Sequence, residues 1–176
     1  MTSVRLLAIV LAALVVDAAP EGARVLAVAR DGRVYVSCAL ADDVLADIDE
    51  AIQSGLSTTV IYEADLRRSV SVWLDRTYAT SLVTASVQRD TLTGRYQLSR
   101  SIDGRLEDSR VTDDKAAMRH FVIAFEKLPL FTTADLEPNV EYYVRVRVRT
   151  RPRVTWFFWP WDRGTATGFA RFTFIP

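Results

Sequence analysis

The stretch that most constrains the fold lies near the C-terminus, where apolar and basic residues alternate. Valine or tyrosine holds every second position from Val140 to Val148, and arginine holds every second position from Arg145 to Arg153. Successive side chains of a β-strand point to opposite faces, so this alternation predicts a strand with one buried apolar row and one arginine row. The chain is therefore expected to build a sheet with a core on one side only.

A second alternating strand is predicted over Thr58–Arg68, and its outward side carries acids. Glu63 and Asp65 stand two residues apart there, the same spacing as the arginines. Oppositely charged side chains on neighbouring strands can pair across a ladder, so these acids are expected to neutralise part of the arginine row. The alternative hypothesis is that the row faces an anionic partner.

Three Gly-containing pairs indicate tight turns between strands, namely Asp31-Gly32, Thr93-Gly94 and Asp103-Gly104. A two-residue Asp-Gly turn favours a hairpin, because both positions need a positive φ. The strands expected besides the two above are a hairpin over Arg24–Leu40, then Val70–Tyr78, Leu82–Thr91, Arg95–Ser101, Arg105–Val111 and Thr167–Ile175.

Two short helices are predicted between these strands. The first covers Asp42–Gln53 and ends at Gly55; the second covers about Asp113–Glu126 with Thr112 as its N-cap. With about eight strands, this pattern favours a mainly β fold, an antiparallel β-sandwich with two short helices. The alternative is an α+β fold, a curved antiparallel sheet with the helices on one face.

The N-terminal region predicts export. One arginine precedes the eleven-residue apolar run Leu6–Val16, which is too short for an ordinary membrane-spanning helix, and Ala18 offers a cleavage site. Cleavage after Ala23 and retention as an uncleaved anchor are the alternatives, and no cysteine follows the run to carry a lipoprotein anchor. We expect a signal peptide over residues 1–18 and a single domain over 19–176, in the periplasm or cell envelope of a bacterium.

No motif indicates catalysis, a cofactor or a metal. Lys+Arg and Asp+Glu both number 22, so no overall charge attracts nucleic acid. The single Cys38 and single His120 cannot supply a disulfide or a four-ligand zinc site, and we expect a packed thiol and a surface imidazole. The chain is predicted to be a non-enzymatic binding domain. The alternatives are a carbohydrate-binding domain or a hydrolase using a carboxylate pair such as Glu63 and Asp75.

The best functional signal follows the arginine strand, in a segment that carries three of the four tryptophans. Its rings can fold back as a lid on the core, dock on a membrane interface, contact a protein, or form a sugar platform. We predict contact with an unknown protein partner or a membrane surface rather than nucleic acid. The candidate residues are Trp156, Phe157, Phe158, Trp159, Trp161, Arg149, Arg151 and Arg153.

Several short motifs resemble those of a family of exported bacterial proteins that is known only as a domain of unknown function. They are Ser54-Gly55-Leu56, the run Thr59–Arg68, Trp73-Leu74-Asp75 and Tyr96-Gln97-Leu98. The resemblance implies a signal peptide and a β-rich periplasmic domain, often encoded near nitrogen-regulation-type sensor kinases. It implies no catalytic residue, cofactor or substrate. The aromatic segment is richer in aromatic residues than this family pattern leads us to expect.

Overall fold

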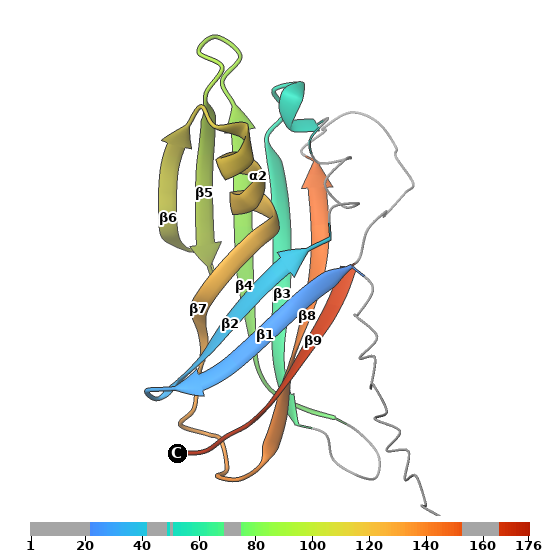
Figure 1. The fold of residues 1–176 in the computed structure, drawn as a ribbon, viewed down its shortest axis with the longest axis vertical. Helices are drawn as coiled ribbons and strands as arrows, with labels where there is room; N and C mark the ends of the chain where they lie inside the picture. Colours follow the sequence, from blue (N-terminus) through green and yellow to red (C-terminus); the bar gives the residue numbers. More distant parts are fainter. Residues whose placement is uncertain (1–21, 42–48, 50, 69–74, 153–165) are drawn as a thin grey trace, which may run out of the picture.

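In a computed structural model, residues 22–41, 49, 51–68, 75–152 and 166–176 are described, and they form two antiparallel sheets (Figure 1). The small sheet has the strand order β1-β2-β7, and the large sheet has the order β6-β5-β4-β3-β8-β9. The predicted mainly β, sandwich-like architecture is confirmed. The strands are β1 (Ala23–Arg30), β2 (Arg33–Leu40), β3 (Thr58–Arg68), β4 (Arg76–Arg89), β5 (Tyr96–Ile102), β6 (Arg105–Thr112), β7 (Ala124–Thr132), β8 (Glu141–Pro152) and β9 (Ala166–Thr173).

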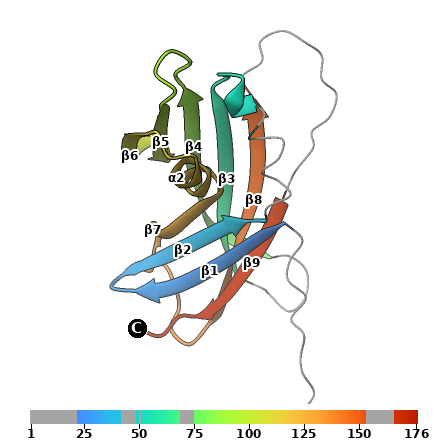
Figure 2. The same cartoon turned by 45° about the horizontal axis from the view of Figure 1, so that its top comes forward.

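The apolar rows of β3 and β8 form the centre of the core, as their alternation predicts. Tyr62 of β3 and Tyr142 of β8 are almost completely buried, and so are the valines, alanine and leucine on the same faces. The small sheet crosses over this face of the large sheet and contributes Val34, Val36 and Cys38 (Figures 1 and 2). Burying both inner faces against each other removes apolar surface from water, which is the main force that holds the two layers together.

The predicted Asp-Gly hairpins are confirmed. Asp31 and Gly32 have φ values of 50° and 75°, and Asp103 and Gly104 have values of 50° and 80°. Positive φ at both central residues defines the turn whose twist matches that of the flanking strands. These two-residue turns are the whole connection between β1 and β2 and between β5 and β6.

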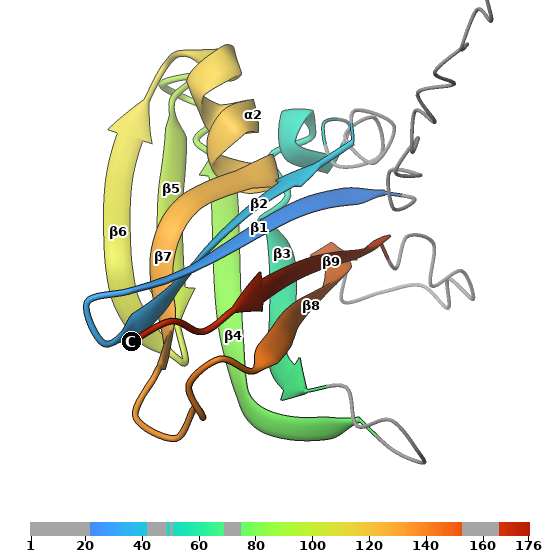
Figure 3. The ribbon, with the colours of Figure 1, turned by 60° about the horizontal axis from the view of Figure 1, so that its bottom comes forward.

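One edge of the large sheet meets one edge of the small sheet where β1 and β9 begin. Gly22 bridges to Thr167, and the two strands start side by side in Figure 3. Gly168 makes this approach possible, because a Cβ there would lie 2.4 Å from the Ala23 carbonyl oxygen. The two sheets therefore meet at the point where these strands begin.

The helix α2 (Lys115–Ile123) is shorter than predicted, and it begins at Lys115, directly after its N-cap Asp114. The Asp114 side chain accepts a hydrogen bond from the Ala116 amide, while Thr112 accepts one from the Asp114 amide, so the expected N-cap Thr112 was wrong. Ala117, which helical spacing places on the same face as Phe121 and Ala124 and which we therefore expected in the core, is exposed. The helix stops at Ile123 because the next residues pair with β2.

The strand β7 is the element that the sequence pattern missed. Ala124 and Phe125 were expected in the helix, and no strand was predicted at Phe131, but all three residues belong to β7. Pro129 argues against a strand in the sequence, because proline has no backbone N–H to donate to a neighbouring strand. The structure accommodates it because β7 is an edge strand, and its register with β2 has two irregularities. The count of strands is therefore nine in the described residues, against about eight predicted.

Two of the predicted elements, the strand at Val70–Tyr78 and the helix at Asp42–Gln53, extend into residues that the structure does not describe. The strands expected at Val70–Tyr78 and Leu82–Thr91 are represented by the single strand β4, and residues 69–74 lie outside the described part. Most of the helix expected at Asp42–Gln53 also lies outside it, although residues 51–53 are helical. Gly55 ends that turn as predicted, with a φ of 81° and a hydrogen bond from its amide to the Ile52 carbonyl.

We expect Gly168→Ala to destabilise the protein by about 1–3 kcal/mol, because the new methyl group would overlap the β1 backbone. Urea unfolding measures the change. The matched control is Thr173→Ala, an exposed position on the same strand, which should change the free energy of unfolding by less than about 0.5 kcal/mol. Equal effects of the two substitutions would contradict a tight β1–β9 junction.

Candidate functional site

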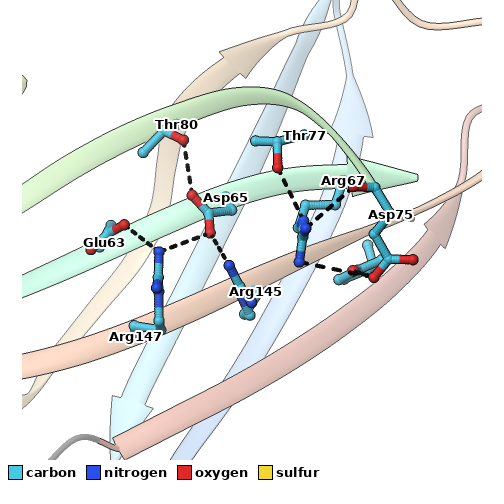
Figure 4. Close-up of polar contacts among 9 residues, drawn as sticks. Glu63, Asp65, Arg67, Asp75, Thr77, Thr80, Arg145 and Arg147 are labelled. Atoms are coloured by element: carbon cyan, nitrogen blue, oxygen red, sulfur yellow. Dashed lines mark hydrogen bonds and ion pairs between the residues drawn. The ribbon is translucent and has the colours of Figure 1, made fainter. Parts of the chain in front are cut away.

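The outer faces of β3 and β8 carry a carboxylate–arginine ladder, which consists of Glu63, Asp65, Arg145 and Arg147. The strand register places Glu63 opposite Arg147 and Asp65 opposite Arg145. Arg145 Nη2 lies 2.6 Å from Asp65 Oδ2, and Arg147 donates to Glu63 and lies 3.3 Å from the same Asp65 oxygen (Figure 4). The predicted pairing of the two rows is confirmed.

Asp65 is the centre of this ladder and is only 4% exposed. Burial acts to raise the pKa of its carboxyl, but hydrogen bonds from Arg145 and Thr80 and the charges of both arginines outweigh burial and leave the pKa below its usual value. The Thr80 hydroxyl donates to the second carboxylate oxygen at 2.9 Å. Asp65 is therefore held as an ionised acceptor, a state that cannot donate a proton.

A second cluster of polar side chains lies next to the ladder, toward the start of β8, and consists of Arg67, Asp75, Thr77 and Tyr143. Arg67 donates to the Thr77 hydroxyl at 3.1 Å and to the Asp75 carbonyl at 3.3 Å (Figure 4). The Tyr143 hydroxyl donates to the Asp75 carboxylate. Burial and the hydrogen bond to Asp75 raise the pKa of Tyr143. These contacts tie the beginning of β4 to β3 and β8.

The carboxylate-pair hypothesis gains no support from this arrangement. Glu63 is engaged by Arg147, and Asp75 is engaged by Tyr143 and lies 3.9 Å from Arg67. Both acids are thus accounted for as partners of neighbouring strands.

Three further arginines follow Arg147 along the chain, namely Arg149 and Arg151 in β8 and Arg153 directly after it. Arg149 is exposed and stands opposite Ile61, so no acid faces it across this ladder. The backbone of Arg151 pairs with Thr59. Arg153, and with it Trp156, Phe157, Phe158, Trp159 and Trp161, lies outside the described residues, so the contact role predicted for them stays a prediction.

The structure brings two distant parts of the chain together at a strand-start corner, which consists of Gly22, Ala23 and residues 166–168. Gly22 directly follows residues 1–21, and Ala166 directly follows residues 153–165. The bridge from Gly22 to Thr167 therefore joins the two points at which these segments enter the described fold. Arg24, one residue beyond the corner, is exposed. No sequence pattern indicated this neighbourhood.

The two other singled-out residues lie where they were expected. Cys38 is 2% exposed in the core, and burial raises the pKa of its thiol to about 12, so it stays an unreactive thiol. His120 is exposed in the last turn of α2. Among the described residues, no group of three or more His, Cys, Asp or Glu side chains is arranged to hold a metal ion. In the same part of the chain, no helix is long and apolar enough to cross a membrane.

Sequence reasoning missed one buried polar group, formed by Arg100 and Tyr62. Arg100 donates to the carbonyl oxygens of Phe121 at 2.6 Å and Ala124 at 2.9 Å, and Tyr62 donates to the Val122 carbonyl at 2.5 Å. The two side chains thereby satisfy carbonyls at the end of α2 that have no partner within the helix. The signal was present: Arg100 occupies the inward row of β5, between Leu98 and Ile102.

We expect Arg147→Ala to lower the free energy of unfolding by about 1 kcal/mol, because it leaves the half-buried Glu63 without its partner. Arg149→Ala is the matched control, since it removes an exposed arginine from the same face of the same strand with no acid opposite. Its effect should stay within about 0.5 kcal/mol. Urea unfolding of both variants checks the difference, and equal losses would contradict a stabilising ladder.

The stability contributed by Asp65 should depend on pH. Its pKa is lower in the folded state than in the unfolded state, so its contribution is present above the unfolded value of about 3.9 and is lost as pH falls through the folded value. Asp65→Asn should therefore cost about 2 kcal/mol at neutral pH and progressively less in acid. Unfolding curves across this range test it; a difference between wild type and variant that is constant with pH would contradict it.

A model of a protein family matches residues 21–153, and its description is "Domain of unknown function (DUF4390)". Neither the characterised proteins nor the solved structures that were compared gave a significant match. The matched region ends before Trp156, so the aromatic segment follows it. Export and the gene neighbourhood that the resemblance implies stay predictions. Because the match spans well over half of the 176 residues, the chain belongs to the DUF4390 family.

Proposed function

We propose that this protein is an exported, non-enzymatic accessory domain of the bacterial cell envelope that docks on an anionic membrane surface through its strand-start corner. The aromatic segment, with Trp156, Trp159 and Trp161, supplies the apolar contacts. The exposed arginines beside the corner supply the charge. A single observation carries the proposal, namely the bridge between Gly22 and Thr167.

The bridge supports the proposal because it joins the attachment points of two apolar segments. The run Leu6–Val16 is connected to Gly22 by five residues, and the aromatic segment is connected to Ala166 by four residues after Trp161. Both segments therefore leave the described fold within a short distance of one corner. If the N-terminal run is retained as an anchor, the aromatic segment is tethered close to the same membrane. If the run is cleaved, the aromatic segment still leaves from that corner.

The combination of tryptophan and exposed arginine near the corner fits a membrane interface better than a protein contact or a sugar platform. Tryptophan settles at the boundary between headgroups and acyl chains, and arginine is attracted to anionic headgroups. Arg24 and Arg149 are exposed beside the corner, while Arg145 and Arg147 are already neutralised within the ladder. Arg149 is thus nearer to the aromatic segment along β8 than the two arginines of the ladder are.

Co-sedimentation with vesicles tests the proposal. The protein, purified as the producing bacterium processes it, should bind vesicles rich in phosphatidylglycerol and bind pure phosphatidylcholine vesicles more weakly, with a loss at high salt. Substituting Trp156, Trp159 and Trp161 together by alanine should abolish binding. Arg24→Gln and Arg149→Gln should each weaken it about fivefold, the equivalent of about 1 kcal/mol per charge near the surface.

Arg33→Gln is the matched control, because Arg33 is exposed on the same hairpin but lies at the opposite end of β2 from Leu40, which pairs with Ala23. It should leave vesicle binding unchanged. Absence of binding to anionic vesicles at low salt would overturn the membrane proposal and leave a protein partner as the occupant. If the triple alanine variant binds normally but unfolds at a lower temperature, the tryptophans form a lid on the core instead.

A further inference from the structure

The two sheets have four edge strands, β1, β7, β6 and β9, whose outer edges differ in how they are covered. The edges β1 and β9 meet each other at the corner. The edge strand β7 is interrupted by Pro129, by a positive φ at Lys127 and by two register irregularities. Within the described residues, no strand pairs with the outer edge of β6, whose backbone amide and carbonyl groups are available to another strand.

The side chains of β6 are unusually exposed for a strand in a six-stranded sheet. All but two of its eight residues are classed as exposed, and Leu106 and Val111 are 64% and 60% exposed. Leu106 lies opposite Ser101 and Val111 lies opposite Gln97, so both point to the outer face of the sheet. Asp108 and Arg110 lie opposite Arg100 and Leu98 and point to the core-side face.

A β-bulge at Glu107 sets this distribution of side chains. Asp108 pairs with Arg100 and Leu106 with Ser101, which leaves Glu107 as the extra residue. In a regular strand, Leu106 and Val111 would point to opposite faces, because their separation is an odd number of residues. The bulge shifts the alternation by one and brings both onto the outer face.

This arrangement makes β6 complementary to itself. If two copies of β6 run antiparallel about a two-fold axis at Ser109, each Val111 stands opposite the other copy's Leu106. Each Arg110 stands opposite the other copy's Glu107 and Asp108, when the bulge is counted as one position. Apolar pairs and opposite charges directly across a ladder are each stabilising, and no like charges face each other.

We propose that β6 is a self-association edge, at which a second copy of this chain adds its own β6 and joins the two large sheets into one. Charged residues usually protect an edge strand from such pairing. Here Arg110 and Asp108 form an ion pair of 2.6 Å within each copy, and in the proposed register each also stands opposite a residue of opposite charge in the other copy. The charges therefore favour this register instead of preventing association. A single strand pair buries less surface than a stable dimer interface, so the association is reversible and depends on concentration.

Disulfide trapping tests the register. Residues opposite each other on antiparallel strands have Cα atoms about 4.5–5.5 Å apart, within the range of about 4.4–6.8 Å that a disulfide spans. Ser109→Cys in the full chain should therefore form a covalent dimer when oxidised with copper phenanthroline, seen on a non-reducing gel. The native Cys38 is buried and should not interfere.

Gln97→Cys is the matched control, because Gln97 is exposed on the same outer face but lies one strand further from the axis. Three strand spacings, about 14 Å, would separate it from its counterpart, which is too far for a disulfide. Cross-linking of Ser109→Cys well above that of Gln97→Cys is expected. Equal cross-linking of the two variants would overturn the proposal.

Analytical ultracentrifugation gives an independent readout on the unmodified protein. A monomer–dimer equilibrium is expected, and Val111→Lys, which faces Leu106 of the other copy, should raise the dissociation constant at least about tenfold, an energy of about 1.4 kcal/mol. Leu92→Lys, at a leucine that is 95% exposed in the β4–β5 turn, should leave it unchanged. A strictly monomeric protein at every concentration would overturn the proposal. Vesicle binding reports separately on the corner, at the other edge of the large sheet.

Discussion

The antiparallel pairing of β3 with β8 is the interaction on which the rest of the structure depends. The inner sides of these two strands form the middle of the core, and their outer sides carry the ladder of Glu63, Asp65, Arg145 and Arg147. A slip of one residue would turn the arginine row into the core, which burial forbids. A slip of two residues would keep the apolar rows inside; in one direction it would place Asp65 opposite Tyr143, and in the other it would still leave both acids opposite arginines. The ladder therefore disfavours one of the two slips that the core alone would allow.

The passage of the chain from the large sheet to the small sheet depends on a second polar arrangement. After β6 the chain forms α2, and β7 begins at the residue directly after the helix. The end of the helix is therefore buried between the layers. Carbonyl groups at a buried helix end need donors, and Arg100 and Tyr62 supply them from the large sheet. The Arg100 guanidinium also lies over the Phe121 ring, 4.3 Å from its centroid. These contacts explain why an arginine stands in an otherwise apolar row.

The two proposed contact regions lie at opposite edges of the large sheet. Strand β9 ends the sheet at the corner from which the N-terminal and aromatic segments depart, and β6 ends it on the other side. Pairing through β6 would therefore leave both corners of a dimer free. Two weak membrane contacts carried by one assembly bind more tightly than either alone, because the second becomes intramolecular after the first forms. Such an assembly suits a domain whose formal net charge is zero.

The alternation of residues by itself determined the antiparallel β-rich architecture, the two long strands β3 and β8 and the pairing of Glu63 and Asp65 with arginines, because a period of two dictates which side chains share a face. The Asp-Gly turns were equally local, since they depend on backbone conformation alone. Only the tertiary structure decided where α2 ends, since pairing of Ala124 and Phe125 with β2 outcompetes their helical pattern. It also decided that Gly22 meets Thr167 and that the bulge at Glu107 gathers Leu106 and Val111 on one face. Contacts between residues far apart in sequence leave no periodic signal, so the corner and the open edge could be found only in the folded chain.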